Sequence, residues 1–195
     1  MSAKHVLQRT TFPSSKTVLL LVDVINPLDF PTAYQLLPGA WSAALAIAKL
    51  KERLVRQGAA CIYANDNYGT WHSEFSDMLR ACQQLPGRRG EIAQLLAPGP
   101  KDLVILKPQH SAFHSTPLDY LLRQIKAEKL VIVGLAADMC VLLTATDARM
   151  RDYSVWVPSD CTAAETPERL QLALQQMQHR FKCSVRRATK SLSNA

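Results

Sequence analysis

The sequence predicts an α/β fold of three layers, in which helices flank a mostly parallel sheet of about six strands. Short apolar runs rich in β-forming residues alternate with stretches of helical periodicity along the whole chain. The first run, residues 18–24, is apolar at every position up to Val22, as expected for a strand covered on both faces. Repeated strand–helix units of this kind favour parallel strands with helices on both sides of the sheet.

The first half of the chain shows these units in order. After the first strand, apolar positions from Ala40 to Leu54 mark one face of a helix that Gly58 closes. The second strand is expected at residues 59–64. A polar and aromatic segment, residues 65–73, then leads into further helical stretches.

The second half repeats the alternation. Thr116 with Pro117 has the pattern of an N-cap and a first helical residue, and Thr166 with Pro167 opens a later amphipathic helix. The elements form a three-layer, Rossmann-like arrangement without an internal repeat or a linker. The remaining strands are expected at residues 103–106, 130–133 and 154–157, with a candidate edge strand at residues 183–185.

Length and composition indicate one well-cored domain. The chain has 195 residues, of which 48% are hydrophobic and 20% are charged, which is typical of globular proteins. We expect residues 1–195 to form a single domain, with about 15 N-terminal and about 10 C-terminal residues at its periphery. No apolar run reaches membrane-spanning length and no hydrophobic signal segment is found, so we expect a cytoplasmic protein without membrane contact.

The cysteines and the net charge narrow the function classes. Five cysteines without a CxxC pair indicate free thiols, with no disulfide framework or zinc site. The net charge is +7, but basic residues crowd the C-terminal segment, and no basic recognition helix or aromatic-studded sheet accompanies them. We therefore expect no nucleic-acid partner.

Three reactive residues follow three of the expected strands: Asp23 the first, Lys107 the third and Cys140 the fourth. Because the carboxyl ends of parallel strands meet at one edge of a sheet, we expect these side chains to converge. Each alone has an ordinary explanation, as a turn residue, a solvated strand end or a buried thiol. Together, the carboxylate can take the thiol proton while the ammonium orients the pair. The helix start at Cys140 is expected to favour its thiolate.

Three segments that carry these residues resemble the isochorismatase-like cysteine hydrolases. This superfamily includes nicotinamidases, N-carbamoylsarcosine amidohydrolases and ureidoacrylate amidohydrolases. The likeness runs in order from about residue 18 to about residue 178. The segments are LLLVDVIN at 19–26, LKPQHSAFHSTPL at 106–118 and GLAADMCV at 134–141.

The resemblance implies an Asp23–Lys107–Cys140 catalytic triad in a hydrolase that cleaves a non-peptide C–N bond of a small-molecule substrate. Asp23 would be the general base, and Cys140 the nucleophile of a covalent acyl intermediate. The resemblance also implies a cis peptide bond between Leu135 and Ala136, with the backbone N–H groups of Ala136 and Cys140 forming an oxyanion hole. A homo-oligomer, a dimer or larger, is implied as well.

Departures from the family pattern concern the pocket and the metal site. The glutamine that many members have after the aspartate is absent, and Ala137 stands in place of the usual threonine. Nicotinamidases carry an Asp-x-His metal pattern after the second strand, where this chain has Asp66 but also Tyr68, and only His72 remains nearby. We therefore expect no metal and no cofactor, and we do not expect nicotinamide as the substrate.

Five residues are candidates for substrate binding. Three of them follow the second strand and are expected to border the pocket, although Trp71 has the equal alternative of covering the next helix. The two phenylalanines are candidate apolar walls, with the core or a subunit interface as their alternative places. The candidates are Phe30, Asp66, Asn67, Trp71 and Phe113.

Two of the five histidines, His110 and His114, lie four residues apart. This spacing pairs metal ligands on a helix, but the helix here is expected to begin after both residues. We therefore expect them in a loop or at the pocket rim, with too few companions for a metal site.

Two other functions stay open. A vinyl-ether hydrolase of the isochorismatase type would need Asp23 as an acid and would not need Cys140. The chain could also be a non-catalytic binding protein, or a thiol redox sensor that uses Cys140 without hydrolysis. No other cysteine is close to Cys140 in sequence, and whether Cys161 is close in space stays open. Nucleotide binding is set aside, because the seven glycines form neither a GxGxxG nor a P-loop pattern.

Overall fold

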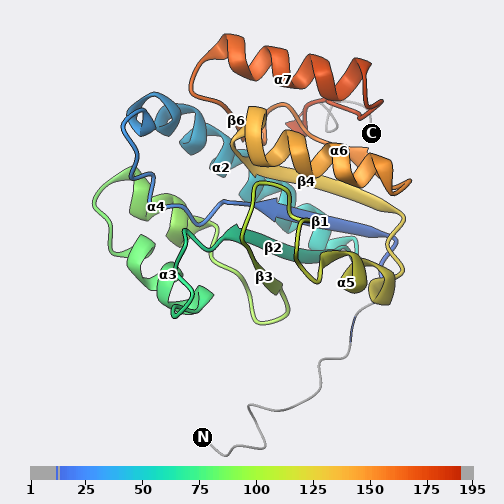
Figure 1. Cartoon of the computed structure of the whole chain (residues 1–195), viewed down its shortest axis with the longest axis horizontal. Helices are drawn as coiled ribbons and strands as arrows, with labels where there is room; N and C mark the ends of the chain where they lie inside the picture. Colours follow the sequence, from blue (N-terminus) through green and yellow to red (C-terminus); the bar gives the residue numbers. More distant parts are fainter. Residues whose placement is uncertain (1–11, 13, 190–195) are drawn as a thin grey trace, which may run out of the picture.

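The computed structural model describes residue 12 and residues 14–189, and its centre is a parallel sheet (Figure 1). The strand order is β3-β2-β1-β4-β5, with a short β6 paired to β4. The strands are β1 (Thr17–Val22), β2 (Ala60–Asp66), β3 (Leu103–Lys107), β4 (Lys129–Leu135), β5 (Ser154–Trp156) and β6 (Thr162–Ala163). The helices are α2 (Ala33–Arg56), α3 (Phe75–Gln83), α4 (Arg88–Leu95), α5 (Leu118–Ile125), α6 (Leu142–Met150) and α7 (Pro167–His179), with a π-helical turn η1 (Ala137–Val141) ahead of α6.

Helices cover both faces of the sheet, which gives the three layers. In the central strand β1, Val18, Leu20 and Val22 point to the face packed by α5, α6 and α7. Leu19 and Leu21 point to the opposite face, packed by α2, α3 and α4. Alternate side chains of a strand face opposite sides, and all five of these are fully buried. This double burial explains why the run is apolar throughout.

The expected α/β fold is confirmed, and β1 to β5 agree with the five expected strands within two residues at each end. The two-residue strand β6 was not expected, because so short a segment leaves no periodic pattern. Residues 183–185 form only an isolated bridge, between Ser184 and Trp156. Helix α2 begins at Ala33, ahead of the apolar face seen in the sequence, and contains Pro38.

The expected helix starts are nearly right. Thr166 caps α7, and its Oγ1 accepts a hydrogen bond from the Arg169 N–H at 3.2 Å. Helix α5 begins one residue later than expected, at Leu118, and Thr116 Oγ1 accepts from the Leu118 N–H at 3.2 Å. Both threonines therefore satisfy a backbone donor that a helix start leaves unpaired.

Two expectations concern the ends of the chain and membranes. The peripheral terminal segments fall largely on residues 1–11, 13 and 190–195, which lie outside the described residues. Within the described part of the chain, no helix is both long enough and apolar enough to cross a membrane.

Candidate active site

Asp23 lies where β1 ends, and two backbone contacts fix it. Its N–H continues the ladder to β2 by donating to the Ala64 carbonyl at 3.0 Å. Its Oδ1 accepts from the Asp66 N–H at 2.6 Å. The backbone of Asp23 is left-handed, with φ of 49°, a conformation that costs a non-glycine residue energy and that gathers at functional sites. The side chain, only 4% exposed, is thus turned into the sheet edge.

Lys107, the last residue of β3, holds this edge together. Its side chain is fully buried, and its Nζ lies 2.9 Å from Asp23 Oδ2 and 3.4 Å from Asp66 Oδ2. The same Nζ donates to the Gln109 carbonyl at 3.2 Å and lies 3.5 Å from Cys140 Sγ. One ammonium therefore contacts two carboxylates, a loop carbonyl and a thiol.

Cys140 reaches this group because the end of β4 lies very close to β1. Gly134 has φ of 118°, and a Cβ there would stand 1.9 Å from the Val22 carbonyl oxygen, so only glycine fits. The chain then passes the Leu135–Ala136 peptide bond, which is cis, and turns through η1 into α6. Cys140 is in η1 and 8% exposed. We refer to Asp23, Lys107 and Cys140 as the triad.

Burial acts on the pKa values of all three residues of the triad. It raises the pKa of Asp23, an effect that the nearby Lys107 charge only partly offsets. For Lys107, burial disfavours the ammonium, but the nearby acidic groups, above all the Asp23 carboxylate, outweigh it and raise the pKa. Burial first and the Asp23 charge second raise the pKa of Cys140 to about 12. Burial beside a carboxylate therefore opposes the thiolate that the helix start was expected to favour.

His110, which was expected in a loop or at the pocket rim, is a neighbour of the Cys140 thiol. Its Nδ1 lies 3.6 Å from Cys140 Sγ, and its side chain is exposed. The bond from Lys107 Nζ to the Gln109 carbonyl folds the loop so that the next residue meets the thiol. The sequence hint of this contact is that His110 follows Lys107 by three residues, but such a spacing does not give the path of a loop.

The candidates that follow β2 differ in their surroundings. Asp66 contacts Lys107 and is half-buried. Asn67 is 6% exposed, and its Oδ1 accepts from the Gly69 N–H at 3.0 Å, so it shapes the turn. Trp71 is 76% exposed. Asp66 contacts the triad through its carboxylate and its N–H. The Asn67 N–H donates to the Lys107 carbonyl at 3.1 Å.

The two candidate phenylalanines, Phe113 and Phe30, differ in burial. Phe113 is 7% exposed within the core on the α5, α6 and α7 face, and its ring stacks on Tyr153 with centroids 6.4 Å apart. Phe113 thus lies in the core, which is one of the places that the sequence left open for it, because the loop after β3 turns this ring inward. Phe30 is 38% exposed, near the surface.

The residues that follow β2 do not fit a transition-metal site. The Asp66 carboxylate is engaged by Lys107 and by the Tyr68 N–H, the latter at 2.7 Å. Tyr68 is 42% exposed, and partial desolvation together with the negative charges of Asp23 and Asp66 raises the pKa of its phenol, so it stays neutral. Among the described residues, no group of three histidine, cysteine or carboxylate side chains is arranged to hold a metal ion.

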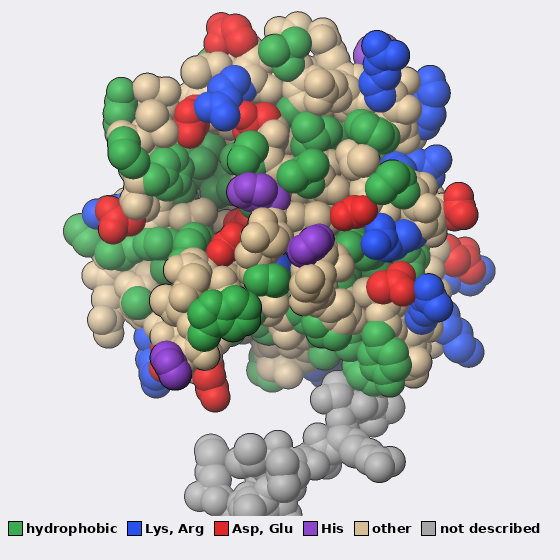
Figure 2. All heavy atoms as spheres, viewed as in Figure 1, with side chains coloured by type: hydrophobic (Ala, Val, Ile, Leu, Met, Phe, Trp, Pro, Cys, Tyr) green, Lys and Arg blue, Asp and Glu red, His purple; other side chains and the backbone are tan. Residues whose placement is uncertain are grey.

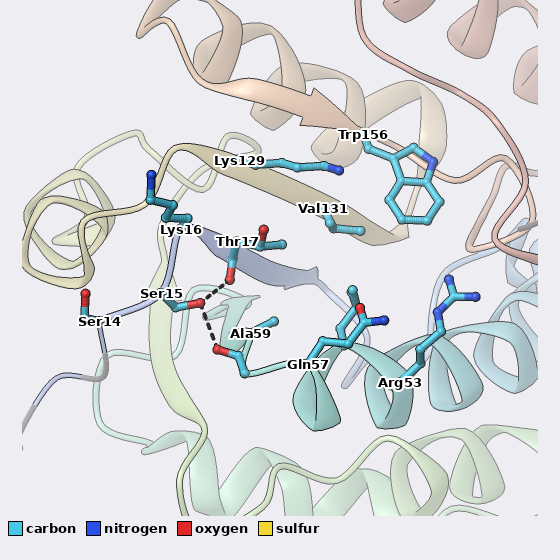
Figure 3. A pocket seen from close by; sticks show the side chains of 12 residues that line it. Ser14, Ser15, Lys16, Thr17, Arg53, Gln57, Ala59, Lys129, Val131 and Trp156 are labelled. Carbon is cyan, nitrogen blue, oxygen red and sulfur yellow. Dashed lines mark hydrogen bonds between the residues drawn. The ribbon is translucent and has the colours of Figure 1, made fainter.

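Two surface hollows differ in their relation to the triad. One, of about 420 Å³, is lined by His110, His114 and α6 residues such as Leu143. Figure 2 shows histidine side chains near the centre of one face of the molecule, close to hydrophobic ones. The larger hollow, of about 800 Å³, lies at the amino ends of the strands between Ser15 and Trp156 (Figure 3). Its size does not make it the reaction site, since the triad is at the other end of the sheet.

Comparison with known proteins gives matches along most of the chain. The isochorismatase domain model matches residues 17–188. An uncharacterized isochorismatase family protein, YaaI of Bacillus subtilis, is 35% identical over 161 residues, which cover 83% of this chain and 88% of that protein. The ureidoacrylate amidohydrolase RutB of Azorhizobium caulinodans is 27% identical over 185 residues, covering 81% of each. The crystal structure of N-carbamoylsarcosine amidase from Thermoplasma acidophilum matches with a TM-score of 0.66 and 26% identity, over 89% of this chain and 96% of that one.

Proposed function

The chain belongs to the isochorismatase family, and we propose that it is a metal-independent cysteine hydrolase that cleaves the C–N bond of a small amide or ureide through an acyl intermediate on Cys140. The observation that carries the proposal is the position of Lys107 Nζ, 2.9 Å from Asp23 Oδ2 and 3.5 Å from Cys140 Sγ. A base, a cation and a nucleophile thus share one buried edge, which is the arrangement that activates a weak nucleophile.

In the first half of the proposed reaction, Cys140 Sγ attacks the carbonyl carbon while its proton passes to Asp23. Because the resting sulfur is a thiol, the proton leaves as the carbon–sulfur bond forms. The raised pKa of Asp23 makes its carboxylate a better base than an ordinary aspartate. Lys107 stabilises the negative charge on both partners. Asp23 then protonates the leaving nitrogen, and ammonia or an amine departs.

Charge also develops on the carbonyl oxygen, and the turn after β4 supplies the donors. We assign the backbone N–H groups of Ala136 and Cys140 as the oxyanion hole. Removing one such donor typically costs about 10²- to 10³-fold in turnover.

The substrate class follows from the relatives. The names of two relatives, ureidoacrylate amidohydrolase and N-carbamoylsarcosine amidase, both describe C–N hydrolysis of small molecules. We place the substrate of this chain in the same class of non-peptide amides and ureides. Asp66, Asn67, Trp71 and Phe30 remain its candidate contacts.

The test is a screen for ammonia or amine release from primary amides, N-carbamoyl compounds and ureido acids. Turnover by the wild type that Cys140→Ala and Asp23→Asn both abolish supports the cysteine hydrolase. Turnover of a vinyl ether that survives Cys140→Ala but not Asp23→Asn would establish the isochorismatase-type reaction instead. Reversible oxidation of Cys140 by dilute peroxide, without hydrolysis of any compound, would favour a thiol redox sensor.

Three broader expectations join this proposal. We expect a homo-oligomer, a dimer or larger, in which residues 1–195 form one domain and which resides in the cytoplasm. Light scattering coupled to size-exclusion chromatography measures the mass of the assembly, and a monomer of 21.7 kDa would contradict the first of these.

A further inference from the structure

One imidazole lies on the outer side of the nucleophile. His110 Nδ1 is 3.6 Å from Cys140 Sγ, and His110 is exposed. Asp23 and Lys107, by contrast, are 4% and 0% exposed, on the inner side of the sulfur. The hollow of about 420 Å³ that His110 helps to line admits water to the ring. The acylation step described above makes no use of this group.

The second half of the reaction needs a base where water arrives. Asp23 is held on the inner side of the sulfur, where Oδ1 accepts from the Asp66 N–H at 2.6 Å and Oδ2 lies 2.9 Å from Lys107 Nζ. Once Sγ carries an acyl group, Asp23 lies behind it, away from the exposed side. His110 is beside the sulfur and open to solvent, so a water bonded to its ring stands next to the acyl carbon.

We propose that His110 is a further catalytic residue, whose Nδ1 accepts a proton from the water that hydrolyses the Cys140 acyl intermediate. This inference rests on the covalent intermediate of the proposed function. The water oxygen bonds to the acyl carbon, the carbon–sulfur bond breaks, and one water proton moves to Nδ1. The imidazolium then returns this proton to the thiolate 3.6 Å away. The products are the free acid, a neutral thiol and a neutral imidazole.

The experiment separates acylation from deacylation with p-nitrophenyl acetate, a probe that does not require the natural substrate. A burst of p-nitrophenol reports acetylation of Cys140, and the slower phase reports hydrolysis of the acetyl-enzyme. In His110→Gln the burst rate should be unchanged, while deacetylation should slow by about 10²-fold. Intact mass spectrometry with peptide mapping should then find acetyl-Cys140 accumulating.

His114→Gln is the matched control. His114 is an exposed histidine of the same loop and lines the same hollow, but its ring makes no hydrogen bond to the Cys140 sulfur in the structure. Both phases should therefore keep their wild-type rates in this variant. Millimolar imidazole should restore deacetylation in His110→Ala, because the exposed position admits the added base. A merely structural role of His110 would not be rescued in this way.

The outcomes distinguish the two proposals. If His110→Gln slows both phases equally, or no acetyl-enzyme accumulates in it, His110 is not the base for deacylation. If the wild type shows no burst, and Cys140→Ala hydrolyses the probe as well as the wild type does, the covalent mechanism itself fails.

Discussion

The same three residue types, lysine, aspartate and cysteine, gather at both ends of the central sheet. At the carboxyl ends of the strands they form the triad. At the amino ends, Lys51 Nζ lies 2.6 Å from Asp102 Oδ2, and both charges act on the buried thiol of Cys61. We call these three residues the amino-end cluster. Burial raises the pKa of Cys61 to about 12, as it does for Cys140.

The two groups differ in the hydrogen-bond partners of their lysines. Lys51 Nζ bonds to the Tyr63 hydroxyl at 2.8 Å, and that hydroxyl donates to the Leu96 carbonyl at 2.9 Å. Asp102 in turn accepts from the Gly99 N–H at 2.7 Å. The lysine of the triad instead reaches the sulfur. The triad and the amino-end cluster therefore share their residue types and their burial. We expect catalysis only at the triad, where the lysine contacts the thiol beside an open surface.

The largest expected effect is the loss of the nucleophile. Cys140→Ala should lower turnover by at least about 10³-fold, since the covalent route is closed. Cys61→Ala should leave turnover per folded molecule unchanged and cost about 1–2 kcal/mol of stability through the small cavity. Steady-state kinetics and urea unfolding of both variants measure this. Comparable activity of the two variants would contradict the contrast between the two clusters.

The lysines give the next effect. Lys107→Met leaves Asp23 buried without its cation, so turnover should fall by at least about 10²-fold and stability by about 3–5 kcal/mol. Lys51→Met should cost about 1–3 kcal/mol, the worth of a charged hydrogen bond, with wild-type turnover. Kinetics at a temperature where both variants are folded separates the two losses. Loss of turnover in Lys51→Met would give the amino-end cluster a role that we do not assign to it.

The strands of the sheet and the residues of the triad were predictable from the sequence for one physical reason. A strand buried on both faces must be apolar, and the polar residue that ends the apolar run marks the sheet edge where parallel strands converge. Asp23 and Lys107 stand out for this reason, and Cys140 follows the next such run. The same logic does not find β6, whose two residues have no period to detect.

The sequence could not predict how deeply Cys140 is buried or which path the loop after β3 takes. The raised pKa of Cys140 depends on how far the turn sinks beside Asp23, which only packing decides. The loop after β3 brings His110 to the thiol and Phe113 into the core, and the sequence had left more than one place open for each. Local pattern gives no direction for such a loop, because hydrogen bonds such as that from Lys107 to Gln109 set its course.

A smaller effect is expected on the reactivity of the thiol itself. Because the Asp23 charge helps to raise the pKa of Cys140 to about 12, Asp23→Asn should lower that pKa and speed alkylation by iodoacetamide at a fixed pH below it. Each pKa unit recovered is worth about tenfold in thiolate. In the wild type the alkylation rate should keep rising up to about pH 12. Asp102→Asn should leave the labelling of Cys140 unchanged, and peptide mapping identifies the site. A slower reaction of Cys140 in Asp23→Asn would mean that the carboxylate promotes the thiolate.

The smallest effect tests whether the Tyr63 hydroxyl merely satisfies its neighbours. Tyr63→Phe removes the partner of Lys51 Nζ and leaves the Leu96 carbonyl without its donor, so we expect a loss of about 1–3 kcal/mol and unchanged turnover. With the hydroxyl gone, Lys51 keeps Asp102 at 2.6 Å, and Cys61, only 4% exposed, stays sealed from solvent. Iodoacetamide should therefore still not label Cys61 in the folded variant. Labelling of Cys61 would show that the Tyr63 hydroxyl, and not the burial of the thiol, keeps Cys61 of the amino-end cluster unreactive.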